Sequence, residues 1–309
     1  MDSPSFEWQI NKVKVGGGTH TFKLNLKDIV NFLIPLPPLA EQKRIVEKLD
    51  NVLANIDELK ANEEKLSILQ KNFPDKLKKS ILQSAIQGKL TEQLATDDNV
   101  EDLLKAIKEE KERLIKEKKI KKQKPLPEIT EEEIPFAIPE SWKWVRLGEI
   151  GIWEAGTTPS RSKSEYYING KIPWVKTGDL TDSILKSVTE NITQLALEET
   201  SLKIKPVGSV LIAMYGATIG KVSILGIEAT TNQACCACVT YKNIYNKYIF
   251  YYLISQRDNL KKMGAGGAQP NISREKIIKT IMPLPPLAEQ KRIVEKLDKL
   301  LADIEELKI

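Results

Sequence analysis

A sixteen-residue segment occurs twice in this 309-residue chain without a single difference. It runs from Pro35 to Asp50 and again from Pro283 to Asp298, so the copies begin 248 residues apart. Solenoid repeats have units of about 20–50 residues, which is far shorter than this spacing. The spacing has the size of a domain. We therefore expect the end of one unit, a complete second unit, and the beginning of a terminal helix.

The repeated segment predicts the start of a long helix. Its double proline delays helix entry, and Glu41 or Glu289 follows where the positive end of the helix dipole favours an acidic residue. Apolar residues then recur at spacings of 4, 3, 4 and 3, the pattern of a narrow seam that pairs with another helix. The seam consists of Ile45, Leu49, Val52, Ile56 and Leu59 in the first copy, and of Ile293, Leu297, Leu300, Ile304 and Leu307 in the second.

The first helix is expected to run from Ala40 to Gln87, which corresponds to roughly 70 Å at 1.5 Å per residue. Pro74 is expected to kink this helix, and Gly88 to end it. A generic dimerising coiled coil would explain the seam alone. The duplication on either side of a domain instead favours a spacer between two similar modules.

The composition changes twice between the two copies. Residues 97–137 form a charged connector. Within it, residues 97–133 include ten basic and twelve acidic side chains, and their pattern predicts one short amphipathic helix. Residues 138–281 alternate short apolar segments with turn residues, so the fold class is α+β with a strand-rich domain. The expected strands are Trp142–Leu147, Ile172–Lys176, Ser209–Met214, Lys221–Leu225 and Ala234–Val239, and the expected helices are Lys247–Leu260 and Ser273–Thr280.

The basic excess of the chain lies in this strand-rich domain. Between Trp142 and Ile281 there are 18 basic and 11 acidic residues, a net charge of +7, whereas the whole chain carries +5 and the remainder −2. Concentrated positive charge suits DNA, although ordinary surface lysines would give the same excess. From loop position and side-chain chemistry we expect DNA contacts from Arg161, Lys163, Lys176, Thr177, Tyr215, Lys221 and Gln269.

Several site classes are not expected. The glycine-rich stretch Tyr215–Lys221 has three residues between its glycines and valine after its lysine, so it fails the pattern of a phosphate-binding loop. His20 is the only histidine, which argues against a Ser-His-Asp triad or a histidine-rich metal site. We therefore expect no catalytic residue, no metal site and no cofactor.

The three cysteines, Cys235, Cys236 and Cys238, are too close together for a zinc module and read as core residues of a strand. Neighbouring strand residues point to opposite faces, so Cys235 and Cys236 should face different sides. There is no apolar stretch of about 18 residues and no signal peptide in the sequence. The expected location is the cytoplasm, with no membrane partner.

Taken together, six segments resemble the specificity subunit of type I restriction-modification systems, and the resemblance covers essentially the whole chain. The segments are Pro35–Val46, Gln83–Leu90, Pro139–Gly148, Ile212–Lys221, Thr231–Cys236 and Pro283–Val294. The resemblance implies two target recognition domains, each of which reads half of a split site in double-stranded DNA. It also implies that a long helix follows each domain. The two helices would pack antiparallel as a coiled coil and dock methyltransferase subunits, through which restriction subunits join, and the specificity subunit itself would not be catalytic.

The arrangement departs from that pattern at both ends. Residues 1–33 are expected to be the C-terminal tail of a first recognition domain, and 34–96 the first spacer helix. Residues 138–281 would be a complete recognition domain that reads one half-site, and 282–309 the start of the second helix. A homodimer that reads a symmetric split site and a coiled-coil adaptor that does not bind DNA are the alternatives. An enzyme acting on DNA is disfavoured, because neither a carboxylate cluster with a lysine nor an Asn-Pro-Pro-Tyr motif is found.

Overall fold

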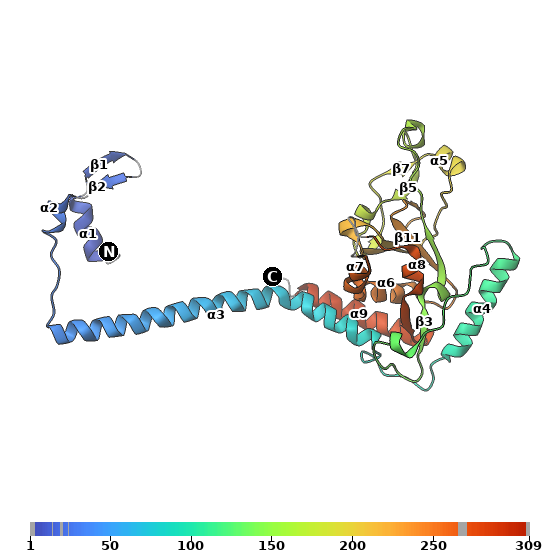
Figure 1. Ribbon diagram of the computed structural model, residues 1–309, viewed down its shortest axis with the longest axis horizontal. Helices are drawn as coiled ribbons and strands as arrows, with labels where there is room; N and C mark the ends of the chain where they lie inside the picture. Colours follow the sequence, from blue (N-terminus) through green and yellow to red (C-terminus); the bar gives the residue numbers. More distant parts are fainter. Residues whose placement is uncertain (1–3, 14, 19–20, 24, 265–270, 307–309) are drawn as a thin grey trace. The chain divides into compact units, whose positions relative to one another are not determined.

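The computed structural model describes residues 4–13, 15–18, 21–23, 25–264 and 271–306. These residues divide into two compact units, Met1–Gln70 and Lys71–Ile309 (Figure 1). Helices and strands both contribute substantially, which confirms the α+β class. His20, Gln269 and Leu307, which the sequence singled out, lie outside the described residues.

The smaller unit begins with helix α1 (Pro4–Val13), the antiparallel strands β1 (Val15–Gly18) and β2 (Thr21–Lys23), and the short helix α2 (Leu26–Ile29). The side chain of Gln9 exchanges two hydrogen bonds with the backbone of Leu33 at 2.8 and 3.1 Å. The rings of Phe6 and Phe32 meet edge to face, with their centroids 5.2 Å apart. These contacts hold α1 against the chain that leads into the first repeat.

Helix α3 (Leu39–Ile86) confirms the long helix, and its ends lie within one residue of the expected bounds. The helix continues through Pro74, which is buried. Gly88 adopts φ +70°, a conformation that glycine takes at little cost, and the amide of Lys89 bonds back to the carbonyl of Ser84 at 3.0 Å. This is the geometry of a C-terminal cap, as the sequence predicted.

A five-stranded sheet lies at the centre of the larger unit, in the order β4-β11-β8-β9-β6. Strand β11, second in this order, is antiparallel to both of its neighbours, β4 and β8. Cys236 and Cys238 lie in the main hydrophobic core and Cys235 in a second cluster, because alternate residues of β11 point to opposite faces. The strands span β4 Gly151–Ala155, β6 Ile184–Leu185, β8 Val210–Ala213, β9 Val222–Leu225 and β11 Cys235–Thr240.

Two smaller sheets complete the larger unit. One has the order β10-β5-β7, and in the other β12 pairs antiparallel with β3. In Figure 1 the β5–β7 sheet lies at the upper end of this unit, while α9 and the last turns of α3 lie at the lower end. The strands span β3 Lys143–Arg146, β5 Ile172–Val175, β7 Asn191–Ile192, β10 Thr230–Thr231 and β12 Ile281–Leu284. The helices are α4 Val100–Lys116, α5 Gln194–Glu199, α6 Asn246–Ser255, α7 Arg257–Gly264, α8 Arg274–Lys279 and α9 Leu287–Glu306.

All five strands expected from the sequence are present, but the prediction was incomplete. Strands β4, β6, β7, β10 and β12 and helix α5 were not expected, and the single helix predicted at Lys247–Leu260 is divided into α6 and α7 at Gln256. Beyond the break, the guanidinium of Arg257 donates to the carbonyl of Gly220 at 2.9 Å. This contact ties α7 to a distant loop, which a pattern confined to 14 residues does not reveal.

The charged connector packs onto the strand-rich part of the chain. Val100, Leu103 and Ile107 of α4 are buried in the same hydrophobic core as Trp142. Arg146, only 3% exposed, bonds through its guanidinium to the carboxylate of Glu133 and to three backbone carbonyls. The predicted functional boundaries at 97, 138 and 282 remain predictions, since all three fall inside this one unit.

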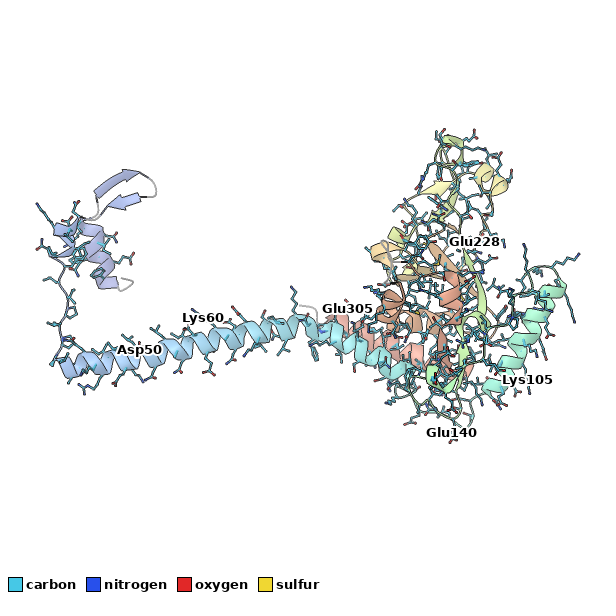
Figure 2. All side chains as sticks on the ribbon, viewed as in Figure 1. Asp50, Lys60, Lys105, Glu140, Glu228 and Glu305 are labelled. Carbon is cyan, nitrogen blue, oxygen red and sulfur yellow. The ribbon has the colours of Figure 1, made fainter. Side chains whose placement is uncertain are left out.

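The two copies of the repeated segment have opposite environments. All five positions of the first seam are 40–67% exposed, and Figure 2 shows the side chains around Asp50 and Lys60 projecting outward from α3. In the second copy Ile293, Leu297 and Ile304 are buried, Leu300 is half-buried, and α9 packs on α6. The pairing of the two seams with one another stays a prediction.

Candidate nucleic-acid interface

Two of the loops predicted to contact DNA leave the central sheet at the same end. Strands β4 and β8 both run antiparallel to β11, with Ala155 opposite Cys236 and Ala213 opposite Cys235. The carboxyl ends of β4 and β8 therefore lie together, beside the first residues of β11. Loop 156–163 follows β4, and loop 214–221 follows β8.

The third loop, residues 176–179, follows β5 and reaches the same region through the β10-β5-β7 sheet. Strand β5 pairs in parallel with β10, which places Val175 opposite Thr231. The amide of Asn232 bonds to the carbonyl of Val175 at 2.9 Å, and the amide of Thr157 bonds to the carbonyl of Thr231 at 3.0 Å. Lys176 comes directly after Val175. The three loops therefore begin around the residues that lead into β11.

Glycines make this close approach of backbone segments feasible. A Cβ atom on Gly156 would lie 1.8 Å from the carbonyl oxygen of Thr231. Gly216 and Gly220 adopt φ +64° and +78°, where other residues are strained. Strand β9 follows Gly220 after a single residue, whereas a helix would have to follow a phosphate-binding loop. The structure thus gives a second reason to reject that motif.

Two of the predicted cations share one carboxylate. The guanidinium of Arg161 pairs with both oxygens of Glu190, and Lys176 Nζ lies 3.0 Å from Glu190 Oε2. The guanidinium also lies over the rings of Tyr167 and Trp174, 4.3 and 5.0 Å from their centroids. The hydrogen bond with Arg161, assisted by Lys176, lowers the pKa of Glu190 to about 2. Both cations therefore hold the β5–β7 end of the domain together.

Lys163 is also engaged within the chain. Its ammonium lies 2.9 Å from the hydroxyl of Tyr166 and 3.0 Å from a carboxylate oxygen of Glu199. These two partners raise the pKa of Lys163 above its usual value. Contact between DNA and this lysine would require an exchange of its carboxylate partner. The sequence prediction missed Glu190, which lies 29 residues from Arg161, and Glu199, which lies 36 residues from Lys163.

Tyr215 and Lys221 are the exposed members of the predicted set whose side chains are not paired with a carboxylate in the described part of the chain. Tyr215 is 39% exposed, and Lys221 is exposed with no side-chain hydrogen bond or ion pair to the described part of the chain. Thr177 is half-buried in a turn, and Gln269 lies outside the described residues. Lys221 of loop 214–221 is therefore the predicted cation whose ammonium is most available to DNA.

Other site classes find no support among the described residues. All three cysteines are buried and unbridged, and burial raises the pKa of Cys236 to about 12, so thiolate chemistry is disfavoured. Across residues 4–264 and 271–306, apart from the short gaps before residue 25, no three His, Cys, Asp or Glu side chains are grouped as metal ligands would be. Within the same ranges, each helix is too short or too polar to span a bilayer.

Sequence comparison places the chain among known proteins. A family model, described as the type I restriction modification DNA specificity domain, matches residues 6–69 and 139–309. The EcoR124I/EcoR124II specificity subunit of Escherichia coli is 35% identical over 162 residues, which cover 51% of this chain and 40% of that protein. The EcoAI specificity subunit, also of Escherichia coli, is 28% identical and covers 96% and 59%, respectively. The chain thus spans about half the length of these relatives.

The crystal structure of the HsdS subunit from Thermoanaerobacter tengcongensis is similar in fold. It superposes with a TM-score of 0.50 at 22% identity, and covers 99% of this chain and 62% of that one. At this identity the likeness concerns the fold alone. It is consistent with the mixed α+β architecture and the long helix described above.

Proposed function

Because the chain belongs to the type I restriction modification DNA specificity domain family, we propose that it is a DNA-reading subunit of a type I restriction-modification complex. The convergence of loops 156–163, 176–179 and 214–221 at one end of the central sheet carries this proposal. The net charge of +7 between Trp142 and Ile281 supports it, since phosphate neutralisation supplies much of the affinity for DNA. One such domain would read one half-site.

The proposed partners are methyltransferase subunits, and restriction subunits that join through them. In this proposal the exposed seam of α3 supplies an apolar helix face to the complex, and the catalytic groups belong to the partners. The proposed setting is the cytoplasm. If the purified chain alone cleaved DNA in the presence of magnesium, the non-catalytic assignment would be wrong.

A homodimer is a second form of this proposal. Two copies would present two recognition domains and would read a symmetric split site. The first seam supports this form, because Ile45, Leu49 and Ile56 of α3 are at least 40% exposed at helix-pairing spacing. Size-exclusion chromatography with light scattering on the full chain tests it. A dimer at micromolar concentration is expected, and a strict monomer would remove this form.

DNA binding by the reconstituted complex tests the main proposal. We expect a gel shift with chain and methyltransferase together, and methylome sequencing of a host that carries both should report one motif. Lys221→Ala should weaken the shift. Lys186→Ala is the matched control, because this exposed lysine follows β6, whose parallel pairing with β9 places it at the opposite end of the sheet.

The alternative of a coiled-coil adaptor makes the opposite prediction. An adaptor would give no shift even with methyltransferase present, and no methylated motif in the host. Equal shifts for Lys221→Ala and Lys186→Ala, at several salt concentrations, would remove Lys221 from the interface without removing the proposal itself.

A further inference from the structure

A basic pocket opens beside strand β4, and none of its three cations is among the residues chosen from the sequence. Its volume is about 380 Å³, more than ten times the ~30 Å³ that one water occupies in the liquid. Gly156 and Thr157, the first residues of loop 156–163, form part of its wall. The pocket therefore adjoins the region where the three loops meet. The other lining residues are Glu154, Ala155, Ser201, Lys203, Lys205 and Arg274.

Three cations and one carboxylate line this pocket. Glu154 accepts from Lys203 Nζ at 2.7 Å and from Lys205 Nζ on its other oxygen. The two lysines lower the pKa of Glu154 although burial opposes this, so the carboxylate is ionised and its charge is offset. Arg274 adds a third positive charge. The local net charge is therefore +2, whereas Arg161, Lys176 and Glu190 together have a net charge of +1.

The basic side chains of the pocket differ in their exposure and in how many of their donors are bonded within the chain. The Lys205 side chain is only 7% exposed, so its pair with Glu154 is structural. The Lys203 side chain is 66% exposed, and its ammonium bonds one group, Glu154, so two of its three N–H donors are left for a ligand. In the described part of the chain, Arg274 is bonded only through Nη1, to the carbonyl of Trp153 at 3.3 Å. A guanidinium has five N–H donors, so most of those on Arg274 are available.

Hydroxyl groups complete the donor set. Thr157 Oγ1 and Ser201 Oγ lie 2.8 Å apart across the pocket wall, and either can donate to the other. One hydroxyl hydrogen of this pair therefore remains for a third group. An ammonium, a guanidinium and a hydroxyl around a cavity are the donors that bind phosphate oxygens in protein–DNA complexes.

We propose that this pocket holds one backbone phosphate of the DNA, bound by Lys203 and Arg274 with a hydroxyl of Thr157 or Ser201. The inference rests on the proposed function. The pocket contact fixes the position of the domain on the duplex and carries no base specificity. Loop 214–221 follows β8, two strands away from β4 at the same end of the sheet. The pair of Lys205 with Glu154 supports the wall and does not contact the phosphate.

The salt dependence of DNA binding by the reconstituted complex tests the proposal. The slope of log Kobs against log salt changes by about 0.9 for each phosphate contact. The double variant Lys203→Ala/Arg274→Ala is expected to reduce the slope by about one, and to weaken specific and non-specific DNA alike. Arg274→Lys should keep most of the slope. Lys186→Ala, at the opposite end of the sheet, should leave it unchanged.

The outcomes separate this inference from the proposed function. If the double variant kept the wild-type slope while Lys221→Ala still weakened DNA binding, the phosphate contact in the pocket would be overturned. The proposed function would remain intact. No DNA binding by the wild-type complex would overturn both. Phosphorus NMR of inorganic phosphate with the full chain distinguishes the source of the anion. Phosphate binding that the double variant abolishes, with no change in the DNA slope, would show a site for free anions and would also overturn the proposal.

Discussion

The indole N–H of Trp142 donates a hydrogen bond of 2.8 Å to the carboxylate of Glu289, and both side chains are buried. Thr91 and Gln93 donate to the other oxygen of the same carboxylate at 3.1 and 2.9 Å. The second repeated segment is thereby joined to the start of the strand-rich region and to the chain that follows α3. Glu41, the identical position of the first copy, is exposed.

Replacement of this carboxylate should affect the two copies differently. We expect Glu289→Ala to lower the free energy of unfolding by about 1–3 kcal/mol or more, because three buried or half-buried donors lose their acceptor. Glu41→Ala, in the same sequence context, should change it by less than about 0.5 kcal/mol. Urea unfolding followed by tryptophan fluorescence measures both. Equal losses would contradict the described environments.

The apolar seam offers a second matched pair. Leu297 is 1% exposed and Leu49 is 53% exposed, although both occupy the same position of the repeat. Leu297→Ala should cost about 2–5 kcal/mol, as for other buried leucines that leave a cavity. Leu49→Ala should cost less than about 0.5 kcal/mol at protein concentrations low enough to keep the chain monomeric. A large loss for Leu49→Ala at low protein concentration would show that the first seam is covered in solution.

The close approach of backbones at Gly156 gives a third prediction. Gly156→Ala places a methyl group 1.8 Å from the carbonyl oxygen of Thr231, which must move to accommodate it. We expect a loss of about 1–3 kcal/mol from overpacking, and weaker DNA binding because three loops meet there. Gly178→Ala is the control, since its added methyl group would meet open space at an ordinary φ. Thermal unfolding that fails to separate the two variants would argue against this geometry.

The repeated segment also shows where prediction from the sequence must stop. Helix α3, the cap at Gly88 and the opposite facing of Cys235 and Cys236 follow from local periodicity and local conformational preference, so the sequence predicts them. Burial of Leu297 and exposure of Leu49 cannot follow from local pattern, because the surrounding sixteen residues are identical. Only the distant partners, Trp142 among them, make the difference.

The candidate site has the same limit. Loop composition indicates which loops are polar and basic, and the strand pattern places β8 and β9 around one of these loops. The sequence does not reveal that Glu190 binds Arg161 and Lys176, or that Lys203 and Arg274 share a pocket with Glu154. These arrangements depend on pairings between residues tens of positions apart, which the sheet topology decides.

The ion pair between Arg161 and Glu190 predicts a pH dependence at the β5–β7 end of the domain. The hydrogen bond with Arg161 lowers the pKa of Glu190 from its ordinary 4.5 to about 2. A lowered carboxyl pKa contributes stability that is fully present above the unfolded value and is lost as the pH falls through the folded one. The loss should therefore occur between about pH 4.5 and pH 2, with no effect near neutrality.

Carbon-detected NMR of the Glu190 carboxyl group measures this titration directly. We expect a midpoint near 2, and in the Arg161→Gln variant a midpoint shifted towards 4.5, because Lys176 alone remains as a partner. A Glu190 midpoint near 4.5 in the unaltered chain would show that Arg161 is not held by this carboxylate in solution, and would return Arg161 to the cations available for DNA.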